Sequence, residues 1–286
     1  MQTDGVLAET IAAAEQILGS DLDRITIERA VVGLFFTGVA LSTGATGACA
    51  TPARSMLEPS CCPSSPAMVA FADPLRGRPV RALLAEAASP HPLRRAVGVA
   101  VLNALAESCW QRRPHPGVEL RGGIDAFDAA AITPRDHVVL VGAFIPFLRA
   151  LKRLGQAYTV LERDPAMLKP EEMPHFRPAA EAEAVLPRGD VVLITGSTLL
   201  NDTLDALLRL CRSNVRVVVV GPTVGLLPDA FLRRGVAILG GVRVTDSGRF
   251  LDTLAEGGSG HHFFGQSAER VVLVRRAAEP AAQAAA

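Results

Sequence analysis

Residues 190–221 read DVVLITGSTLLNDTLDALLRLCRSNVRVVVVG, in which two short runs of valine, isoleucine and leucine enclose a segment with helical spacing. Each short run is followed by glycine, a pattern that favours a fully buried strand. Leucines three and four positions apart between the two runs predict an amphipathic helix. A strand, a helix and a second buried strand in this order are typical of parallel strands joined by a crossover helix.

The same alternation extends in both directions from this stretch. Two apolar runs precede it, HVVLVG (137–142) and AYTVLE (157–162), and the segment FIPFLRALKRLG between them has helical spacing. Two more runs follow it, VAILGG (236–241) and VVLVRR (271–276). Near-continuous apolar strands interleaved with amphipathic helices indicate an α/β fold, a Rossmann-like and mostly parallel sheet covered on both faces.

The part of the chain before this alternation has a different pattern. We expect a helix over 4–18, two strands over 24–33 and 34–42, a long loop over 42–66, and helices over 78–88 and 93–110. Residues 112–123 contain two prolines and three glycines, which favours a domain boundary there. The prediction is therefore a smaller α+β module over 1–120, a Rossmann-like domain over 121–276 and a disordered tail over 277–286.

Composition excludes several classes of protein. Hydrophobic residues make up 49% of the 286, which is enough for packed cores. The 29 basic residues are balanced by 29 acidic ones, which argues against a nucleic-acid partner and against binding to anionic membranes. The uncharged run between Arg29 and Arg54 is rich in Gly, Thr and Ser, so we expect strands there and no membrane span. No export signal is visible, and we expect a cytoplasmic protein with free thiols.

In open α/β sheets, ligands bind beyond the carboxyl ends of the strands. The turn after the first predicted strand reads GAFIPF, and its Phe144 and Ile145 would block the close approach that a dinucleotide pyrophosphate needs. Glu162 does lie twenty residues after Gly142, where a ribose-binding carboxylate belongs. A solvated strand end is the alternative for Glu162. We therefore expect no conventional NAD site.

The turn over 195–202 is the second candidate for binding. Ser197 or Thr198 could cap the helix that follows, which would leave backbone N–H groups directed at an anionic or polar ligand. Asn201 could add a side-chain amide. The alternative is an ordinary capped helix with no ligand.

Three of the five cysteines fall in the predicted loop over 42–66, at Cys49, Cys61 and Cys62. Thiolates are good ligands for soft or borderline transition metals such as zinc, copper and iron. The two histidines at 261–262 could complete such a site if the two domains face each other. We expect a transition-metal ion here; unliganded loop cysteines are the alternative.

Two stretches carry a family resemblance, GDVVLITGSTLLNDTLDALL (189–208) and VVVVGPTVGLLPDAFLRRGVAILGGVRVTD (217–246). They resemble the second domain of the family described as putative heavy-metal chelation proteins. GVAVLNALAE (98–107) is similar to a helix of the family's first domain, a small unit with an enolase-N-terminal-like fold. The resemblance implies a site in the crevice between the two domains. It implies ligand-binding roles for nine positions: Asn103, Glu162, Thr195, Gly196, Thr198, Asn201, Gly221, Pro222 and Thr223.

Two classes of function are consistent with these observations. The resemblance and the thiols favour a metal-handling protein that binds a metal ion or a small metal chelate, and the resemblance implies association with metal-uptake machinery. The alternative is an enzyme that makes or modifies a metallophore with a nucleotide-like cosubstrate. The chain shows no recognisable nucleophile and general base, which weakens that alternative. The sequence is also compatible with a homo-oligomer.

Overall fold

The stretch over 190–221 folds as its pattern predicts. In the computed structural model, which describes residues 5–52, 71, 73–225 and 227–276, it forms β8 (Val191–Thr195), α7 (Leu204–Leu210) and β9 (Arg216–Val220). Strand β8 pairs in parallel with β9 on one side and with β5 (Val138–Val141) on the other. The three apolar runs are therefore neighbours in one sheet, as expected.

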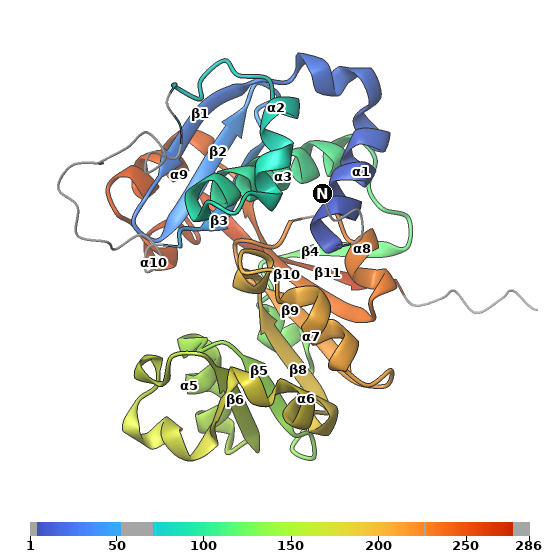
Figure 1. Cartoon of the computed structure of the whole chain (residues 1–286), viewed down its shortest axis with the longest axis vertical. Helices are drawn as coiled ribbons and strands as arrows, with labels where there is room; N and C mark the ends of the chain where they lie inside the picture. The colour runs from blue at the N-terminus through green and yellow to red at the C-terminus, as the bar shows by residue number, and fades with distance from the viewer. Residues whose placement is uncertain (1–4, 53–70, 72, 226, 277–286) are drawn as a thin grey trace, which may run out of the picture.

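This sheet has eight strands (Figure 1), in the order β4-β11-β10-β9-β8-β5-β6-β7. The remaining members are β4 (Val118–Gly122), β6 (Tyr158–Glu162), β7 (Phe176–Pro178), β10 (Val236–Val244) and β11 (Ala268–Arg275). From β7 to β10 all neighbours are parallel, whereas β11 and β4 are antiparallel additions. The chain runs outward from β5 to β7, then returns to β8 and runs to β10, which is Rossmann strand order. The α/β class is confirmed.

Both faces of this sheet are buried. Along β5, Val138 and Leu140 join the apolar cluster that contains Leu148, whereas Val139 and Val141 join the cluster on the opposite face. Period-two alternation with apolar residues on both sides gives the continuous runs seen in the sequence. Besides α7, the α-helices between β4 and β11 are α4 (Ala126–Ala129), α5 (Ile145–Leu154), α6 (Ala182–Val185), α8 (Asp229–Arg233), α9 (Ser247–Ala255) and α10 (Gly260–Phe263).

A second, three-stranded sheet is built from β1 (Ile27–Val32), β2 (Phe36–Leu41) and β3 (Thr46–Ala50), all antiparallel. Its helices are α1 (Val6–Leu18), α2 (Arg81–Leu84) and α3 (Pro92–Arg112). The expectation of a loop over 42–66 is wrong for its first part, which holds β3. Strand β3 (TGACA) consists of small residues because α3 packs directly on it, and Thr46 is its one β-branched residue, so the usual strand signal is weak.

Short 3-10 helices connect many of these elements: η1 (Gly19–Arg24), η4 (Ala85–Ala88), η5 (Pro165–Met167), η6 (Pro170–His175), η7 (Ala179–Glu181), η8 (Leu186–Arg188) and η9 (Gly196–Leu199). In the part of the chain that the structure describes, no helix combines the length and the apolarity needed to cross a bilayer. The segment over 112–123 also contains β4, which pairs with β11, so this segment belongs to the larger sheet as well as linking the two parts.

Helix α9, which follows β10 of the large sheet, packs against the small sheet and so connects the two. Figure 1 shows this helix, drawn in orange, beside the blue strands β1 and β2. Gly38 and Ala40 of β2 face α9, where a side chain on Gly38 would meet Leu251 and Leu254. The alternate residue Val39 belongs to the cluster around α3. The small sheet therefore lies between its own helix α3 and a helix supplied by the C-terminal part of the chain.

An ion-pair network also joins the two parts, at the start of α1. Glu9 accepts hydrogen bonds from Arg233 and from Arg234, the latter at 2.6 Å. Arg234 also binds Asp205 at 2.6 Å, and Asp205 accepts from the backbone N–H of Val6 at 3.2 Å. The hydrogen bonds from Arg234 and Arg233 lower the pKa of Glu9 from 4.5 to about 2.

We expect Glu9→Gln to lower the free energy of unfolding by about 1 kcal/mol at pH 7, since this network is partly exposed. The folded-state pKa of Glu9 is depressed, so its contribution is present above the unfolded pKa and is lost as the pH falls toward 2. Urea titrations of wild type and variant should therefore differ at pH 7 and converge near pH 2–3. Glu256→Gln, at an exposed helix end, is the control and should match wild type throughout. A difference that persists undiminished at low pH would contradict the ionic explanation.

Candidate functional site

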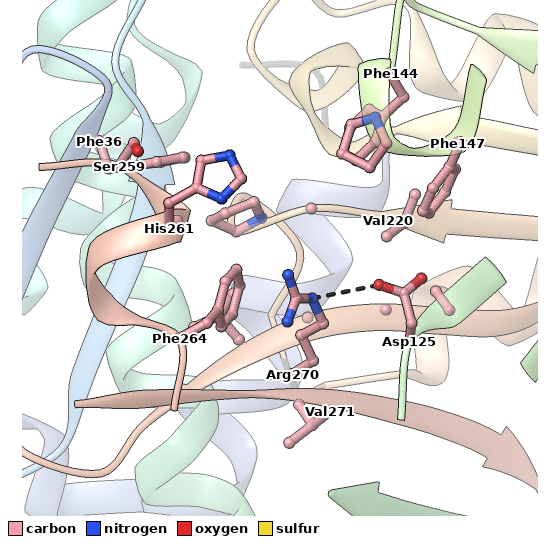
Figure 2. Close-up of a pocket in the computed structure, with 18 of the residues that line it drawn as sticks. Phe36, Asp125, Phe144, Phe147, Val220, Ser259, His261, Phe264, Arg270 and Val271 are labelled. Carbon is pink, nitrogen blue, oxygen red and sulfur yellow. Dashed lines mark ion pairs between the residues drawn. The ribbon is translucent and has the colours of Figure 1, made fainter. Parts of the chain in front are cut away.

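A cavity of about 300 Å³ lies at the carboxyl ends of the central strands (Figure 2). Residues 220–222 at the end of β9 and residues 240–242 of β10 form its floor, because β10 continues beyond the end of β9. The start of α5, the start of α4, α10 and β11 form its walls. Phe35, in the β1–β2 turn, and Phe36, at the start of β2, also line it. The cavity is therefore bordered by both parts of the chain.

Aromatic side chains make up much of the wall. Phe144 and Phe147 lie 4.9 Å apart between ring centroids on one side, and Phe36 and Phe264 lie on the other. Phe144 also reaches across to Gly221, where the tip of its ring lies 4.0 Å from the place a β-carbon would occupy. Gly221 has a φ of 134°, which disfavours any residue with a side chain. Such a wall suits a flat apolar ligand better than a bare ion.

Among the described residues that line the cavity, four polar side chains interrupt this apolar surface: Asp125, Arg270, His261 and Ser259. Asp125 caps α4 by accepting from the Phe127 N–H at 2.9 Å, and its second oxygen lies 3.3 Å from Nε of Arg270. The Arg270 guanidinium lies 3.9 Å from the ring centroid of Phe264. Figure 2 shows the Arg270 side chain between Phe264 and Asp125. The cavity therefore combines an aromatic wall with one oriented cation.

Two of the nine positions expected to bind ligand, Gly221 and Pro222, line this cavity. The turn over 195–201 does not. The expectation that Ser197 or Thr198 caps the helix is wrong. Thr195 supplies the cap, because its hydroxyl accepts from the Ser197 N–H at 3.3 Å. Thr198 is buried and donates to the Thr195 carbonyl at 2.7 Å. The expected helix start is a four-residue 3-10 helix, η9, and α7 begins only afterwards.

The remaining residues of that turn are held by the chain itself. The exposed Asn201 accepts a hydrogen bond from the Thr203 hydroxyl at 2.6 Å. Gly196 is buried, and a β-carbon there would lie 2.8 Å from a methyl group of Val224. These contacts explain the polar and small residues of the turn through local structure. A ligand role for the turn stays a prediction.

Glu162 is neither a solvated strand end nor directed at the cavity. Its Oε2 accepts from the Ala143 N–H at 2.8 Å, and its Oε1 accepts from Arg163 and Asp164 at 2.7 and 3.1 Å. The Ala143 amide follows Gly142 directly and belongs to the turn where a pyrophosphate binds in dinucleotide sites. A phosphate would have to compete with this carboxylate. Glu162 thus joins the carboxyl ends of β5 and β6.

Asn103 and Thr223 form a joint between the two parts of the chain. The Asn103 side-chain amide donates to the carbonyls of Ala48, at 2.8 Å, and Thr223, at 3.0 Å, with a longer contact to that of Pro222, at 3.4 Å. The Thr223 hydroxyl, which is buried, accepts from the Ala50 N–H at 3.1 Å. These bonds join α3, β3 and the turn after β9. The crevice at this point is filled by protein groups.

Cys49 also lies at this joint. It is fully buried in β3, and burial raises the pKa of its thiol to about 12. The expectation that Cys49 shares a polar loop with the other two thiols is therefore wrong, because Cys49 lies in strand β3, which packs against α3. Cys61 and Cys62 lie outside the described residues. Metal binding by the three cysteines stays a prediction.

No group of three or more His, Cys, Asp or Glu side chains is placed to hold a metal ion within 5–52, 71, 73–225 and 227–276. The two histidines expected to complete a metal site have different positions. His262 closes the first turn of α10, where its Nδ1 accepts from the Ser259 N–H at 3.0 Å. His261 is exposed and lines the cavity.

No pattern in the sequence singled out four principal side chains of the cavity, Asp125, Arg270, Phe36 and Phe264. One signal was available. The pair Gly240–Gly241 interrupts an otherwise apolar strand, and glycine within a strand often marks a place that another group approaches closely. The structure bears this out at Gly240, where a β-carbon would lie 2.5 Å from that of Ala126.

The fold and the cavity define an α/β protein of Rossmann topology, joined to a three-stranded α+β unit, with a cavity of ligand size at the strand ends. Two family models, both described as putative heavy-metal chelation, match residues 125–273 and 15–106. The first covers more than half of the chain. The protein belongs to this family.

Relatives in solved structures support the fold. A protein of unknown function from Pyrococcus horikoshii superposes with a TM-score of 0.71 at 22% identity, over 94% of this chain and 100% of the other. A second, from Desulfitobacterium hafniense, superposes with a TM-score of 0.67 at 21% identity, over 93% of this chain and 100% of the other.

A sequence relative is also known. An uncharacterised protein of Methanocaldococcus jannaschii is 31% identical over 179 residues. That match covers 61% of this chain and 64% of the relative's length.

Proposed function

We propose that this protein binds a small organic chelate of a transition metal, and that it recognises the organic part of the chelate in the cavity over β9 and β10. The observation that carries the proposal is the cavity itself, which pairs an aromatic wall with Arg270 and Asp125. The family's description as heavy-metal chelation supports the metal. The position of the cavity, bordered by both sheets, agrees with a site in the crevice between the two parts.

The donor atoms around the cavity favour a chelate over a bare ion. Transition-metal sites in proteins use about four or more donor groups, mostly imidazole, thiolate or carboxylate. Among the lining residues that the structure describes, His261 is the one imidazole and Asp125 the one carboxylate, and Asp125 already binds Arg270. An ion in the cavity would take most of its ligands from the organic molecule. His261 would be free to occupy an open coordination position.

Equilibrium dialysis of untagged protein tests the proposal. Ni²⁺, Cu²⁺ or Zn²⁺ would be supplied alone, or with an excess of citrate, L-histidine or pyridine-2-carboxylate, and retained metal measured by elemental analysis. We expect at least one chelate to be retained in about 1:1 ratio and the bare ions to be retained far less. Val242→Phe, which fills the cavity from β10, should abolish retention. Val32→Phe, the same change on an exposed part of β1, is the control and should leave retention intact.

Equal retention by Val242→Phe and wild type would show that the cavity is not the site. Retention of bare ions at the level of the chelates would point instead to protein donors, including the thiols at Cys61 and Cys62. Mass spectrometry of small molecules released from freshly purified protein gives an independent readout. It should identify a metal-chelating compound in wild type that is missing from Val242→Phe.

A further inference from the structure

The Arg270 side chain is held in a defined orientation from two directions. Asp125 lies 3.3 Å from Nε, and the Phe264 ring lies under one face of the guanidinium, 3.9 Å from its carbon. Each of these partners is itself anchored. Asp125 caps α4 through the Phe127 N–H, and Phe264 packs against Phe263, with 4.7 Å between ring centroids. A flexible side chain is thereby preorganised at the cavity wall.

The donors that remain on Arg270 define what it can bind. Among the described residues, no protein acceptor is bonded to either terminal nitrogen of this guanidinium. Arginine binds carboxylates through two parallel N–H groups, either from Nε and one terminal nitrogen or end-on from both terminal nitrogens. Since Asp125 occupies the Nε side, the end-on pair is the one presented to a ligand. A carboxylate bound there would lie in the guanidinium plane.

The local charge favours a monoanion. Asp125 already offsets the charge of Arg270, and the described residues that line the cavity include no lysine and no second arginine. A phosphate with nearly two negative charges would be repelled by the Asp125 carboxylate, whereas a carboxylate adds a single charge. The apolar part of the ligand would face Phe144 and Phe147 on the opposite wall (Figure 2).

We infer that the ligand of this cavity is a planar aromatic or heteroaromatic monocarboxylate, whose carboxylate binds end-on to Arg270 and whose ring packs against the phenylalanine wall. This inference rests on the proposed function in one respect, because it places the organic part of the chelate in the same cavity. It adds the chemical class of that organic part. It also assigns Arg270 as the specificity-determining residue and Asp125 as its positioning residue.

The test uses metal-free probes on the full chain, measured by isothermal titration calorimetry and ligand-observed NMR. Pyridine-2-carboxylate should bind about 10- to 100-fold more tightly than pyridine-2-carboxamide or phenyl phosphate, because a charge-assisted pair contributes about 1.5–3 kcal/mol. Arg270→Gln should remove this preference for the carboxylate. Arg275→Gln, on the same strand but bonded to the Leu232 carbonyl, is the matched control and should keep it.

Asp125→Asn provides a readout that a purely structural role would not change. Asparagine retains the cap on α4, so folding should be preserved. Removing the negative charge should raise the affinity for phenyl phosphate and narrow its difference from the carboxylate. An unchanged preference in both Arg270→Gln and Asp125→Asn would overturn the inference.

The outcomes also separate this inference from the proposed function. Retention of metal chelates that depends on Val242 but not on Arg270 would overturn the carboxylate anchor and leave chelate binding in place. Binding of metal-free pyridine-2-carboxylate that depends on Arg270, without retention of any metal chelate, would support the anchor and refute the proposed function.

Discussion

Replacing Gly47 by alanine is expected to lower the free energy of unfolding by about 3 kcal/mol or more, because β3 and α3 touch backbone to backbone at this residue. A β-carbon on Gly47 would lie 2.2 Å from the Ala104 nitrogen and 2.3 Å from the Ala100 oxygen. Helix backbone cannot move aside as a flexible side chain can. The helix would have to lift from the sheet, which would also separate Asn103 from the Ala48 carbonyl that it binds at 2.8 Å.

Urea unfolding followed by circular dichroism measures this loss. Gly248→Ala is the matched control, since its added methyl group would lie 3.6 Å from the nearest heavy atom, an oxygen of Asp246, inside helix α9. Alanine at this helical position should leave stability unchanged or raise it by up to about 1 kcal/mol. Equal effects of the two substitutions would show that the close contact at Gly47 is not important for stability.

The second large effect is expected for Asn103→Asp, which preserves shape and replaces the amide with a carboxyl group. The amide nitrogen faces the carbonyls of Ala48 and Thr223 at 2.8 and 3.0 Å. A carboxylate in its place would leave both carbonyls without a donor and would add a negative charge beside them. We expect the free energy of unfolding to fall by about 2–4 kcal/mol at pH 7.

This loss should depend on pH with a defined sign. The carbonyls favour the protonated acid, so the folded-state pKa of the introduced carboxyl group should lie above the unfolded value of about 3.9. A raised folded pKa means that the variant is relatively most stable below about pH 4 and weakens as the pH rises. Asn201→Asp is the control, because the hydrogen bond that the exposed Asn201 makes with the Thr203 hydroxyl uses its oxygen, which aspartate retains. Similar losses in the two variants, or a loss at position 103 that shrinks with rising pH, would refute the role given to the amide.

Much of the fold was predictable because its signals are local. The strands β5, β8, β9 and β10 are buried on both faces, so their sequences are continuous apolar runs that stand out without any tertiary information. Helix α5 was equally clear, since it ends at Gly155, which adopts a φ of 62°. Strand β3 was missed because its neighbours in space, and not its own side chains, make it a strand.

The site was less predictable than the fold. Gly221 and Pro222 were found because ligands collect at strand ends, and both line the cavity. Glu162 and Thr223 were singled out as polar residues near these ends, and Asn103 through the family resemblance, yet their hydrogen bonds go to the chain itself. A polar residue that binds a ligand and one that satisfies buried backbone groups have the same appearance in a sequence.

The sequence by itself determined the Rossmann-like sheet, the family and the division of the chain into two differently patterned parts, because periodicity and local motifs need only near neighbours. Tertiary structure alone decided which residues meet at the cavity. Phe36, Asp125 and Arg270 are far apart in the chain and lie on three different elements. They come together because α9 and α10 pack on the small sheet while β11 and β4 extend the large one. That arrangement depends on the packing of whole surfaces, which no short stretch of sequence encodes.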